Sequence, residues 1–354
     1  TRDGFFTNAI YGFLNILEKL RADEKPDALC VAFDLKAPTF RHLKYDGYKA
    51  TRHGMPEELA QQMPVMKQVL RAMSIPIYEC QGWEADDVIG TVGRICSNNA
   101  WQCVIVTGDR DSLQLIDDNV NVKLVISKPG QTNATLYDRA QFEAEYGFEP
   151  KKLIDLKALM GDASDNIPGV AGVGPKTAKE LLLKFGSLDG VYANLDNPSV
   201  RPKLREKLEA GKDNAYLSYE LATIIPEAPI DFAPEDALLQ PYHKQELYQL
   251  FQRLEFVKLI DKYGLRSAAV EAPKASKAEH LPKAESVPDD LDACALYFAP
   301  DGSLGIAWEG GVCALTPMEA QMNPLCLAPE TKLILHDSKS ALHRLAELGL
   351  DGRE

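Results

Sequence analysis

The chain has 354 residues, of which 45% are hydrophobic, 26% charged and 8% aromatic, proportions typical of a soluble globular protein. This length allows two or three domains, and no apolar run approaches the roughly 18 residues that a membrane-spanning helix needs. The net charge of −13 argues against nucleic-acid binding by the surface as a whole, so charge has to be considered segment by segment.

The seven cysteines are scattered, odd in number and include no C-x-x-C pair. This pattern indicates free thiols in a reducing compartment, not a disulfide framework or a zinc site. No secretory signal is present at the start, so we expect a cytoplasmic monomer with no membrane partner. Because the chain begins with Thr1 and stops within a polar stretch, we also expect a fragment truncated at both ends.

The first 150 residues alternate between short apolar runs and stretches with helical spacing. This alternation predicts an α/β domain with a largely parallel sheet over residues 1–150. The predicted strands are 28–34, 103–109 and 122–127, and the predicted helices are 56–73 and 84–97.

From about residue 150 the strand signal fades. Helical repeats, several of them ended by glycine, predict a helical second domain over residues 151–265. Residues 266–290 lack aromatics and are rich in Ala, Pro, Lys and Glu, which predicts a mobile linker. Residues 291–354 contain a predicted β-hairpin at 295–317 and a strand at 332–337, the start of a third domain.

Acidic residues gather at four places in the first two domains. Asp34 and Asp109 each end a predicted strand, where the carboxyl ends of parallel strands form a ligand crevice. One such residue is weak evidence, because many only cap the following helix. Three acids at the start of one helix exceed what the helix dipole favours at ~0.3–1 kcal/mol per charge. The eight candidate ligands are Asp34, Glu84, Asp86, Asp87, Asp109, Asp111, Asp162 and Asp165.

No histidine or cysteine accompanies these acids, which disfavours zinc and favours Mg²⁺ or Mn²⁺. Carboxylate sites that hold two ions about 3.5–4 Å apart are typical of phosphodiester cleavage. We therefore predict a two-metal nuclease site in which the eight acids are metal ligands and catalytic residues.

A glycine-rich turn follows the last two acids within residues 161–178, GDASDNIPGVAGVGPKTA. Its glycine order and the absence of a preceding strand match neither the dinucleotide fingerprint nor the Walker loop. Backbone N–H groups at a helix N-terminus bind phosphate, so we expect this hairpin to hold a nucleic-acid backbone. A purely structural helix–turn–helix is the alternative. The expected binding residues are Gly169, Gly172, Gly174, Lys176 and Thr177.

Residues 36–53 form a basic run with a single acid and interleaved aromatic residues. Without context, a charge run is more often a solvated loop than a binding site. The candidates for nucleic-acid contact in this run are Arg41, Lys44, Tyr48, Lys49 and Arg52.

Five motifs carry a family resemblance: FDLKAPTFRH (33–42), YKATR (48–52), GWEADD (82–87), TGDRDSLQL (107–115) and GDASDNIPGVAGVGPKTA (161–178). Over roughly residues 1–265 they resemble the 5′ nuclease domain of bacterial DNA polymerase I, a relative of the flap endonucleases. The resemblance implies a PIN-like core, a helix–hairpin–helix domain with a K⁺ ion at the hairpin, and two Mg²⁺ ions at the acids. It places the basic run at or near a helical arch, with Lys49 and Arg52 among its catalytic residues.

The resemblance also marks two departures. The family has a first strand that ends in another metal-binding Asp, followed by a basic residue in the next helix, and both lie upstream of Thr1. Residues 291–354 resemble the start of a ribonuclease H-like 3′-5′ exonuclease domain, but the strand reading ALYFAPDGS lacks its D-x-E acids. We expect that third domain to be inactive.

The resemblance implies Mg²⁺-dependent 5′-3′ exonuclease and flap endonuclease cleavage of DNA with 5′ flaps, nicks or free 5′ ends, with Mn²⁺ as a substitute ion. It further implies that the full-length protein is a DNA-directed DNA polymerase of replication and repair. Two alternatives stay open: a branched-DNA-binding module that is inactive in this truncated form, and a PIN-type ribonuclease.

Overall fold

The computed structural model describes residues 1–267, except 3, 53 and 129–130, and the short pieces 283–284, 293–298, 303–316 and 332–335. The chain divides into two compact units, Thr1–Val270 and Glu271–Glu354, which are described separately. Among the residues described, no helix is both long and apolar enough to cross a membrane.

The strands of the first unit form two small sheets. β1 (Val31–Ala32) pairs with β2 (Ile77–Tyr78) in parallel, and β3 (Cys103–Thr107) pairs in parallel with β4 (Val120–Lys128). β5 (Gln131–Tyr137) adds an antiparallel edge to β4. The predicted α/β class with parallel pairing is confirmed, although the strands described here do not join into one continuous sheet.

The strand predicted over 28–34 is shorter than expected, because its first residues pair elsewhere. Ala28 forms an isolated antiparallel bridge with Leu238, and the Leu29 N–H donates to the Ala237 carbonyl. Only Val31 and Ala32 remain for β1, which ends just before Asp34.

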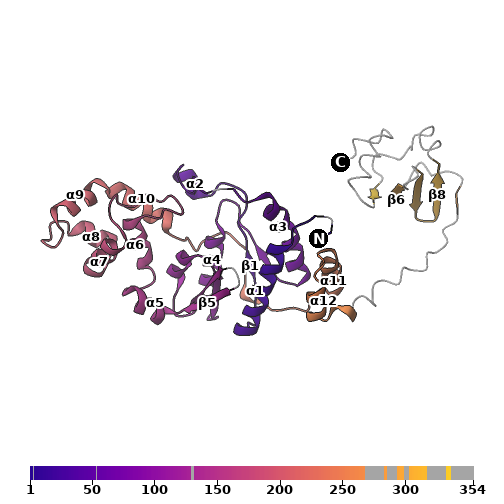
Figure 1. The fold of residues 1–354 in the computed structure, drawn as a ribbon, viewed down its shortest axis with the longest axis horizontal. Helices are drawn as coiled ribbons and strands as arrows, with labels where there is room; N and C mark the ends of the chain where they lie inside the picture. The colour runs from indigo at the N-terminus through magenta and orange to yellow at the C-terminus, as the bar shows by residue number, and fades with distance from the viewer. Residues whose placement is uncertain are drawn as a thin grey trace. The chain divides into compact units, whose positions relative to one another are not determined.

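Helices at both ends of the first unit share one apolar core. α1 (Asn8–Glu24) and α3 (Glu57–Ala72) pack with α11 (Lys244–Arg253) and α12 (Val257–Lys262). Their fully buried side chains include Leu14, Leu70, Leu247 and Phe251. The last part of the predicted helical segment 151–265 therefore belongs to the same core as the N-terminal helices (Figure 1).

A second core joins the three-stranded sheet to the remaining helices. α4 (Ala85–Asn98) packs against β1, β3 and β4, and helices that follow β5 extend the core away from the sheet (Figure 1). No strand is described between residues 138 and 267, as the helical prediction requires. These helices are α5 (Arg139–Tyr146), α6 (Lys152–Met160), α7 (Pro175–Phe185), α8 (Leu188–Ala193), α9 (Pro202–Ala210) and α10 (Lys212–Ala222).

The second unit contains a four-stranded sheet in the order β8-β7-β6-β9. The predicted hairpin is β6 (Ala293–Phe298) with β7 (Leu304–Trp308), continued by antiparallel β8 (Gly311–Leu315), and β9 (Lys332–Leu335) runs parallel to β6. Nearly all of the predicted linker 266–290 and much of 291–354 lie outside the described residues. The assignment of this unit to a degenerate 3′-5′ exonuclease domain stays a prediction.

Candidate active site

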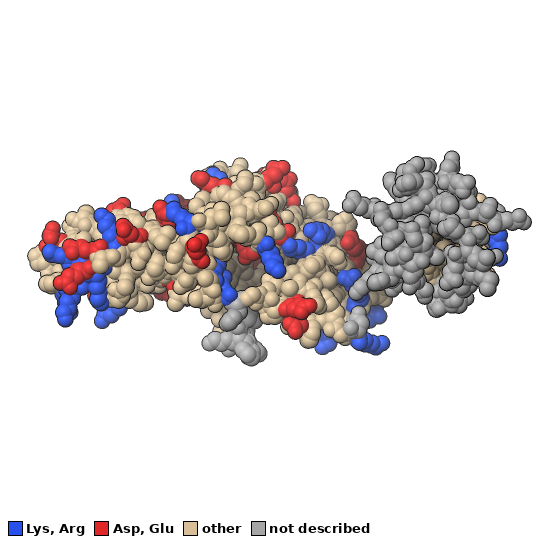
Figure 2. Space-filling model, turned by 90° about the horizontal axis from the view of Figure 1, so that it is seen from above, with Lys and Arg blue, Asp and Glu red and all other residues tan. Residues whose placement is uncertain are grey.

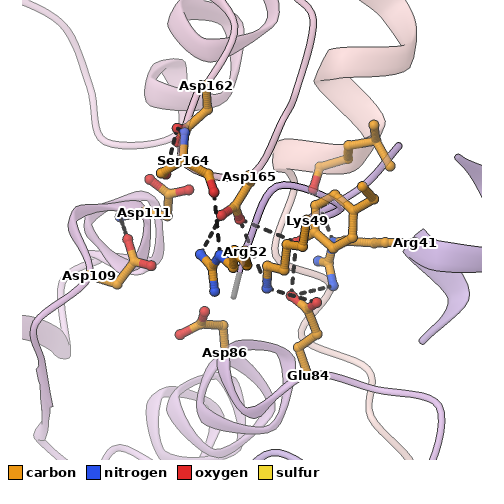
Figure 3. A network of polar contacts seen from close by, with 12 residues as sticks. Arg41, Lys49, Arg52, Glu84, Asp86, Asp109, Asp111, Asp162, Ser164 and Asp165 are labelled. Atoms are coloured by element: carbon orange, nitrogen blue, oxygen red, sulfur yellow. Dashed lines mark hydrogen bonds and ion pairs between the residues drawn. The ribbon is translucent and has the colours of Figure 1, made fainter. Parts of the chain in front are cut away.

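Six carboxylates from separate segments of the first unit point toward a common space (Figure 3). They come from the start of α4, the loop after β3, the 3₁₀ helix η1 (Arg110–Leu115) and the loop after α6. Chain positions up to 81 residues apart are thus brought together at the carboxyl end of β3, as the sequence predicts. The six are Glu84, Asp86, Asp109, Asp111, Asp162 and Asp165.

Asp34 lies beside this group, directly after β1. Its side chain is exposed, and one oxygen accepts a hydrogen bond of 2.7 Å from the Ala85 N–H at the start of α4. The Asp34 charge also helps to raise the pKa of Asp86. The strand-end acid therefore both caps the helix and contributes to the negative field of the site.

Burial and the mutual repulsion of the carboxylates raise the pKa values of two of these acids. Burial, and next the charges of Asp109, Asp34 and Glu84, raise the pKa of Asp86 to about 7. Burial also raises the pKa of Asp111 to about 6, although the neighbouring Lys157 ammonium opposes the shift. Carboxyl groups that resist ionisation because other carboxylates face them mark a place where a cation would bind favourably.

Lys157 is a residue of this site that the sequence analysis did not identify. Its ammonium group lies between the carboxylates of Asp111 and Asp162 and forms an ion pair with each. These contacts raise the pKa of Lys157 in spite of its burial, and the pKa of Asp162 is lowered because Lys157 and Ser164 stabilise its charge. Lys157 is on α6, five residues before Asp162. The last turn of the helix and the loop after it bring the two side chains together.

Two cations of the basic run neutralise the other side of the site. Lys49 Nζ donates to Glu84 Oε1 at 2.9 Å and lies 3.9 Å from Asp165 Oδ2. Arg52 pairs with the Asp165 carboxylate, and Tyr48 Oη donates to Glu84 Oε2 at 3.1 Å. The predicted residues Tyr48, Lys49 and Arg52 therefore contact the acids directly (Figure 3).

Arg41 and Asp87 form a buried pair, which argues against the predicted roles of Asp87 as a metal ligand and of Arg41 as a DNA contact. The guanidinium group of Arg41 donates to both Asp87 oxygens at 2.7 and 2.8 Å, and the two residues are 3% and 0% exposed. Asp87 also accepts hydrogen bonds from the backbone N–H groups of Glu84 and Ile225. An acid so enclosed has no open face for a metal ion, and Arg41 has none for DNA; the pair instead holds α4 against the segment after α10.

Lys44 forms its ion pair with a residue outside the acidic group. It lies at the end of the short helix α2 (Phe40–Lys44), where it pairs with Glu220 of α10 and both side chains are about half exposed. Its predicted contact with DNA stays a prediction.

The loop that carries Asp162 and Asp165 is fixed at both sides. The backbone groups of Asp162 and Ile167 exchange two hydrogen bonds, and the Asp165 carbonyl accepts from the Lys49 N–H at 2.9 Å. Asn166 Nδ2 donates to the Gly47 carbonyl at 2.7 Å. The basic run and the acidic loop therefore form one hydrogen-bonded unit.

The glycines of the hairpin have different structural roles. Gly169 has φ +58°, and a Cβ atom there would lie 2.6 Å from Gly161 Cα, so two backbone segments touch at this point. Gly172 has φ +77° and its carbonyl accepts from Lys207 Nζ at 3.0 Å. Gly174 is the N-cap of α7, with open space around it and with Pro175 in the first turn. Lys176 is exposed and Thr177 half-buried in the same turn.

The donor atoms at the acidic site suit a hard divalent cation. All are carboxylate oxygens, and burial together with neighbouring carboxylates raises the pKa values of Asp86 and Asp111. Within the described part of the chain, however, no three His, Cys, Asp or Glu side chains lie close enough together to bind a metal ion as they stand. Lys49, Arg52 and Lys157 occupy the spaces between them.

Comparison with known proteins agrees with this geometry. Residues 1–147 match the family model of the 5′-3′ exonuclease N-terminal resolvase-like domain, and residues 148–245 match that of the 5′-3′ exonuclease C-terminal SAM fold. The chain belongs to the 5′-3′ exonuclease family. The resemblance drawn from the five sequence motifs is confirmed.

Relatives of this 5′-3′ exonuclease chain are DNA polymerases. DNA polymerase I of Caldicellulosiruptor bescii is 43% identical over 285 residues, which cover 80% of this chain and 33% of that protein. DNA polymerase I of Bacillus caldotenax is 36% identical over 363 residues, which cover 98% of this chain and 41% of that protein. The chain therefore spans about a third to two fifths of the length of these relatives.

Solved structures support the fold of this family member. A T5 5′-exonuclease with bound zinc ions matches with a TM-score of 0.52 and 22% identity, over 64% of this chain and 84% of that one. A T5 D15 flap endonuclease in a pseudo-enzyme–product complex with DNA and metal ions matches with a TM-score of 0.50 and 18% identity, over 69% and 90%. The PIN-like fold with a helical second part is confirmed.

Proposed function

We propose that the first unit is a divalent-metal-dependent 5′-3′ exonuclease and flap endonuclease that hydrolyses DNA. The observation that carries this proposal is the convergence of six carboxylates with Lys49 and Arg52 in a family member. DNA with 5′ flaps, nicks or free 5′ ends is the proposed substrate, recognised by its backbone and shape, since phosphate contacts position DNA without reading its sequence.

Mg²⁺ is the proposed ion, with Mn²⁺ as a substitute, because the donors are oxygen alone. Asp34, Glu84, Asp86, Asp109, Asp111, Asp162 and Asp165 are the proposed ligands, and Asp87 is left out because Arg41 encloses it. Two bound ions would supply an activated water and neutralise charge at the phosphate.

The basic residues of the site have proposed roles of their own. Lys49 and Arg52 now compensate Glu84 and Asp165, and we propose that they turn to the oxygens of the scissile phosphate when these acids have another cationic partner. Lys157 keeps Asp111 and Asp162 charged before a metal ion arrives. It is therefore a positioning residue for these two ligands.

The hairpin is the proposed grip on the DNA backbone at a distance from the cut. The first turn of α7 has no side-chain cap, so its N–H groups face open space near Gly174. The stretch 175–212 contains eight Lys or Arg against five Asp or Glu, a local excess of positive charge in a chain of net charge −13. The Gly172 carbonyl already has Lys207 as a cationic partner, and we assign no role to potassium there.

The test uses the chain with a labelled 5′-flap DNA in Mg²⁺, Mn²⁺ or EDTA, with cleavage and binding measured separately. We expect products only with a divalent ion, and binding in EDTA as well. Asp109→Asn should abolish cleavage and preserve binding, because it removes an exposed acid that caps only η1. Near-normal turnover by this variant would refute the ligand assignment.

The hairpin has its own test in the same assay. Lys176→Ala should weaken binding of all DNA sequences alike and lower the slope of log Kd against log salt by about one ion. Lys262→Ala is the matched control, because Lys262 is an exposed lysine on α12 that pairs with Glu18. It should leave DNA binding and the salt slope unchanged. A loss confined to certain sequences would contradict the hairpin assignment.

The two alternatives make different predictions. A branched-DNA-binding module would bind the flap without forming product in any metal ion, and a ribonuclease would prefer an RNA strand of the same structure. The acidic core alone fits both, whereas the hairpin and the basic run favour DNA cleavage. That the full-length protein is a DNA polymerase, and that the chain is a cytoplasmic monomer, stay proposals drawn from relatives much longer than this chain.

A further inference from the structure

Three cysteines lie at the end of the strands away from the acids. Cys30 directly precedes β1, Cys96 lies in the last turns of α4, and Cys103 is the first residue of β3. The proposed nuclease chemistry uses none of them. Cys96 is 8% exposed, and Cys30 and Cys103 are half-buried.

The geometry of α4 and β3 makes two of these thiols face each other. A Cβ atom on Gly93 would lie 3.6 Å from Ile105 Cδ1, so this face of α4 packs on the face of β3 that Ile105 occupies. Cys96 is three residues beyond Gly93, on the same side of the helix, and Cys103 is two residues before Ile105, on the same side of the strand. Because α4 and β3 run in opposite directions through a short turn, these steps bring Cys96 and Cys103 together.

The turn between them is itself tightly bonded. The Trp101 N–H donates to the Cys96 carbonyl at 2.9 Å, and the Cys103 N–H donates to the Asn119 carbonyl at 2.8 Å. The two thiols are close enough for each to change the pKa of the other. This proximity lowers the pKa of Cys96 and raises that of Cys103, so Cys96 is the better nucleophile of the two.

We propose that Cys96 and Cys103 are a modification site at which a hydroperoxide, such as hydrogen peroxide, forms a reversible intramolecular disulfide. The Cys96 thiolate attacks one peroxide oxygen and breaks the O–O bond, which gives a sulfenic acid and, after protonation, one water. The Cys103 sulfur then attacks the Cys96 sulfur, its proton leaves with the hydroxyl as a second water, and the S–S bond forms. Two thiols are oxidised by two electrons and one peroxide is reduced to two waters.

The third thiol is disfavoured as the attacking nucleophile. Burial, and next the charge of Cys96, raise the pKa of Cys30 to about 12, so it stays protonated at neutral pH. The disulfide would join the end of α4 to the start of β3. The opposite ends of these two elements carry Glu84, Asp86 and Asp109, so the bond would form without contact to the acids.

The test is peptide mapping of the full chain after treatment with hydrogen peroxide. Thiols are then blocked with N-ethylmaleimide in guanidinium, and the chain is digested with trypsin. Both cysteines lie in one expected peptide, residues 95–110, which has no internal Lys or Arg. We expect this peptide to lack both maleimide groups and two hydrogens, and dithiothreitol to restore labelling.

Variants separate this site from general oxidation. Cys103→Ser should leave Cys96 as a sulfenic acid that dimedone labels, and Cys96→Ser should abolish peroxide uptake by the peptide. Cys80→Ser, which changes a half-buried cysteine whose sulfur contacts the Gln81 carbonyl, is the matched control and should leave the disulfide unchanged. Full maleimide labelling of both cysteines after peroxide, or a link between Cys30 and Cys96, would overturn the proposal.

Discussion

Two neighbouring acids of α4 have opposite electrostatic environments. Asp87 is enclosed by Arg41 and two backbone N–H groups, whereas Asp86 faces Asp109, Asp34 and Glu84. The sequence GWEADD suggests the same role for Asp86 and Asp87. The spacing of the two acids does not reveal which of them faces a buried arginine. The difference depends on tertiary partners, and only Asp86 remains a candidate metal ligand.

The raised pKa of Asp86 predicts that stability without metal falls as pH rises. The folded state holds a proton on Asp86 up to about pH 7, whereas the unfolded chain releases it near pH 4, so the unfolding free energy decreases across this window. Asp111, with a pKa of about 6, adds to the same trend. Asp86→Asn mimics the protonated form and should remove the contribution of Asp86 to this fall in stability with pH.

We expect Asp86→Asn to match the parent chain near pH 4 and to be more stable at pH 8. The gain should be on the order of 1–3 kcal/mol, because each pKa unit is worth about 1.4 kcal/mol and solvent reduces the effect at a half-buried group. Urea unfolding in EDTA at both pH values measures it, with the exposed Asp46→Asn as control. Equal stability of Asp86→Asn and parent at pH 8 would contradict the assigned environment.

At the scale of elements, Arg41 connects three parts of the chain. It is in α2, pairs with Asp87 of α4, and donates to the carbonyls of Leu221 and Thr223 at and just after the end of α10. Arg41→Met should lower the unfolding free energy by about 3–5 kcal/mol, because it leaves Asp87 buried without its partner.

Lys44→Met is the control for Arg41→Met on the same short helix. Its ion pair with Glu220 is half exposed, and we expect a loss below about 1 kcal/mol in the same urea experiment. Similar losses for the two variants would show that the Arg41 pair is not the main connection.

The hairpin glycines provide a second test at this scale. In Gly169→Ala the new methyl would meet the backbone of Gly161 at a residue with φ +58°, and we expect a loss of at least about 2 kcal/mol. Gly174→Ala adds a methyl in open space at φ −95° and should stay within about 0.5 kcal/mol of the parent. Thermal unfolding of both variants tests this difference. A Gly169→Ala chain as stable as the parent would be inconsistent with the close approach of Gly169 to the Gly161 backbone.

Much of the site could be predicted from local signals, and the rest depends on long-range packing. Asp34 and Asp109 follow apolar strands, and glycine with proline marks the hairpin, so their places in the fold follow from short stretches of sequence. Lys157 has no such signal, since a lysine in a helix is usually a surface residue. The burial of Arg41 and the pairing of Ala28 depend on residues 221–238, far along the chain.

At the scale of the first unit, charge is mixed on the face shown in Figure 2. Lys and Arg side chains lie among Asp and Glu there, and several basic side chains stand out at the end formed by α7, α8 and α9. The net charge of −13 is therefore a poor guide to the proposed DNA contacts. Those contacts depend on local groups of cations.

The shared core of the terminal helices predicts where the first unit can be shortened. A chain that ends after Ser267 keeps α11 and α12, and its first unit should unfold at the same temperature as in the parent. A chain that ends after Gln240 loses Leu247, Phe251 and Leu259 from the core of α1 and α3. We expect it to unfold at a much lower temperature or to aggregate. Circular dichroism melts of both chains test this, and equal midpoints would contradict the packing.

The acidic loop is bonded to the basic run on one side and continues into the hairpin on the other, where the Gly169 N–H donates to Ser218 Oγ. In the proposed function, this hydrogen-bonded link would keep the acidic site and the hairpin at a fixed distance from each other. The phosphate that is cut would then lie at a constant number of nucleotides from the phosphate that the hairpin holds, whatever the length of the flap. Accuracy in trimming would depend on the hydrogen bonds that hold the loop of Asp162 and Asp165.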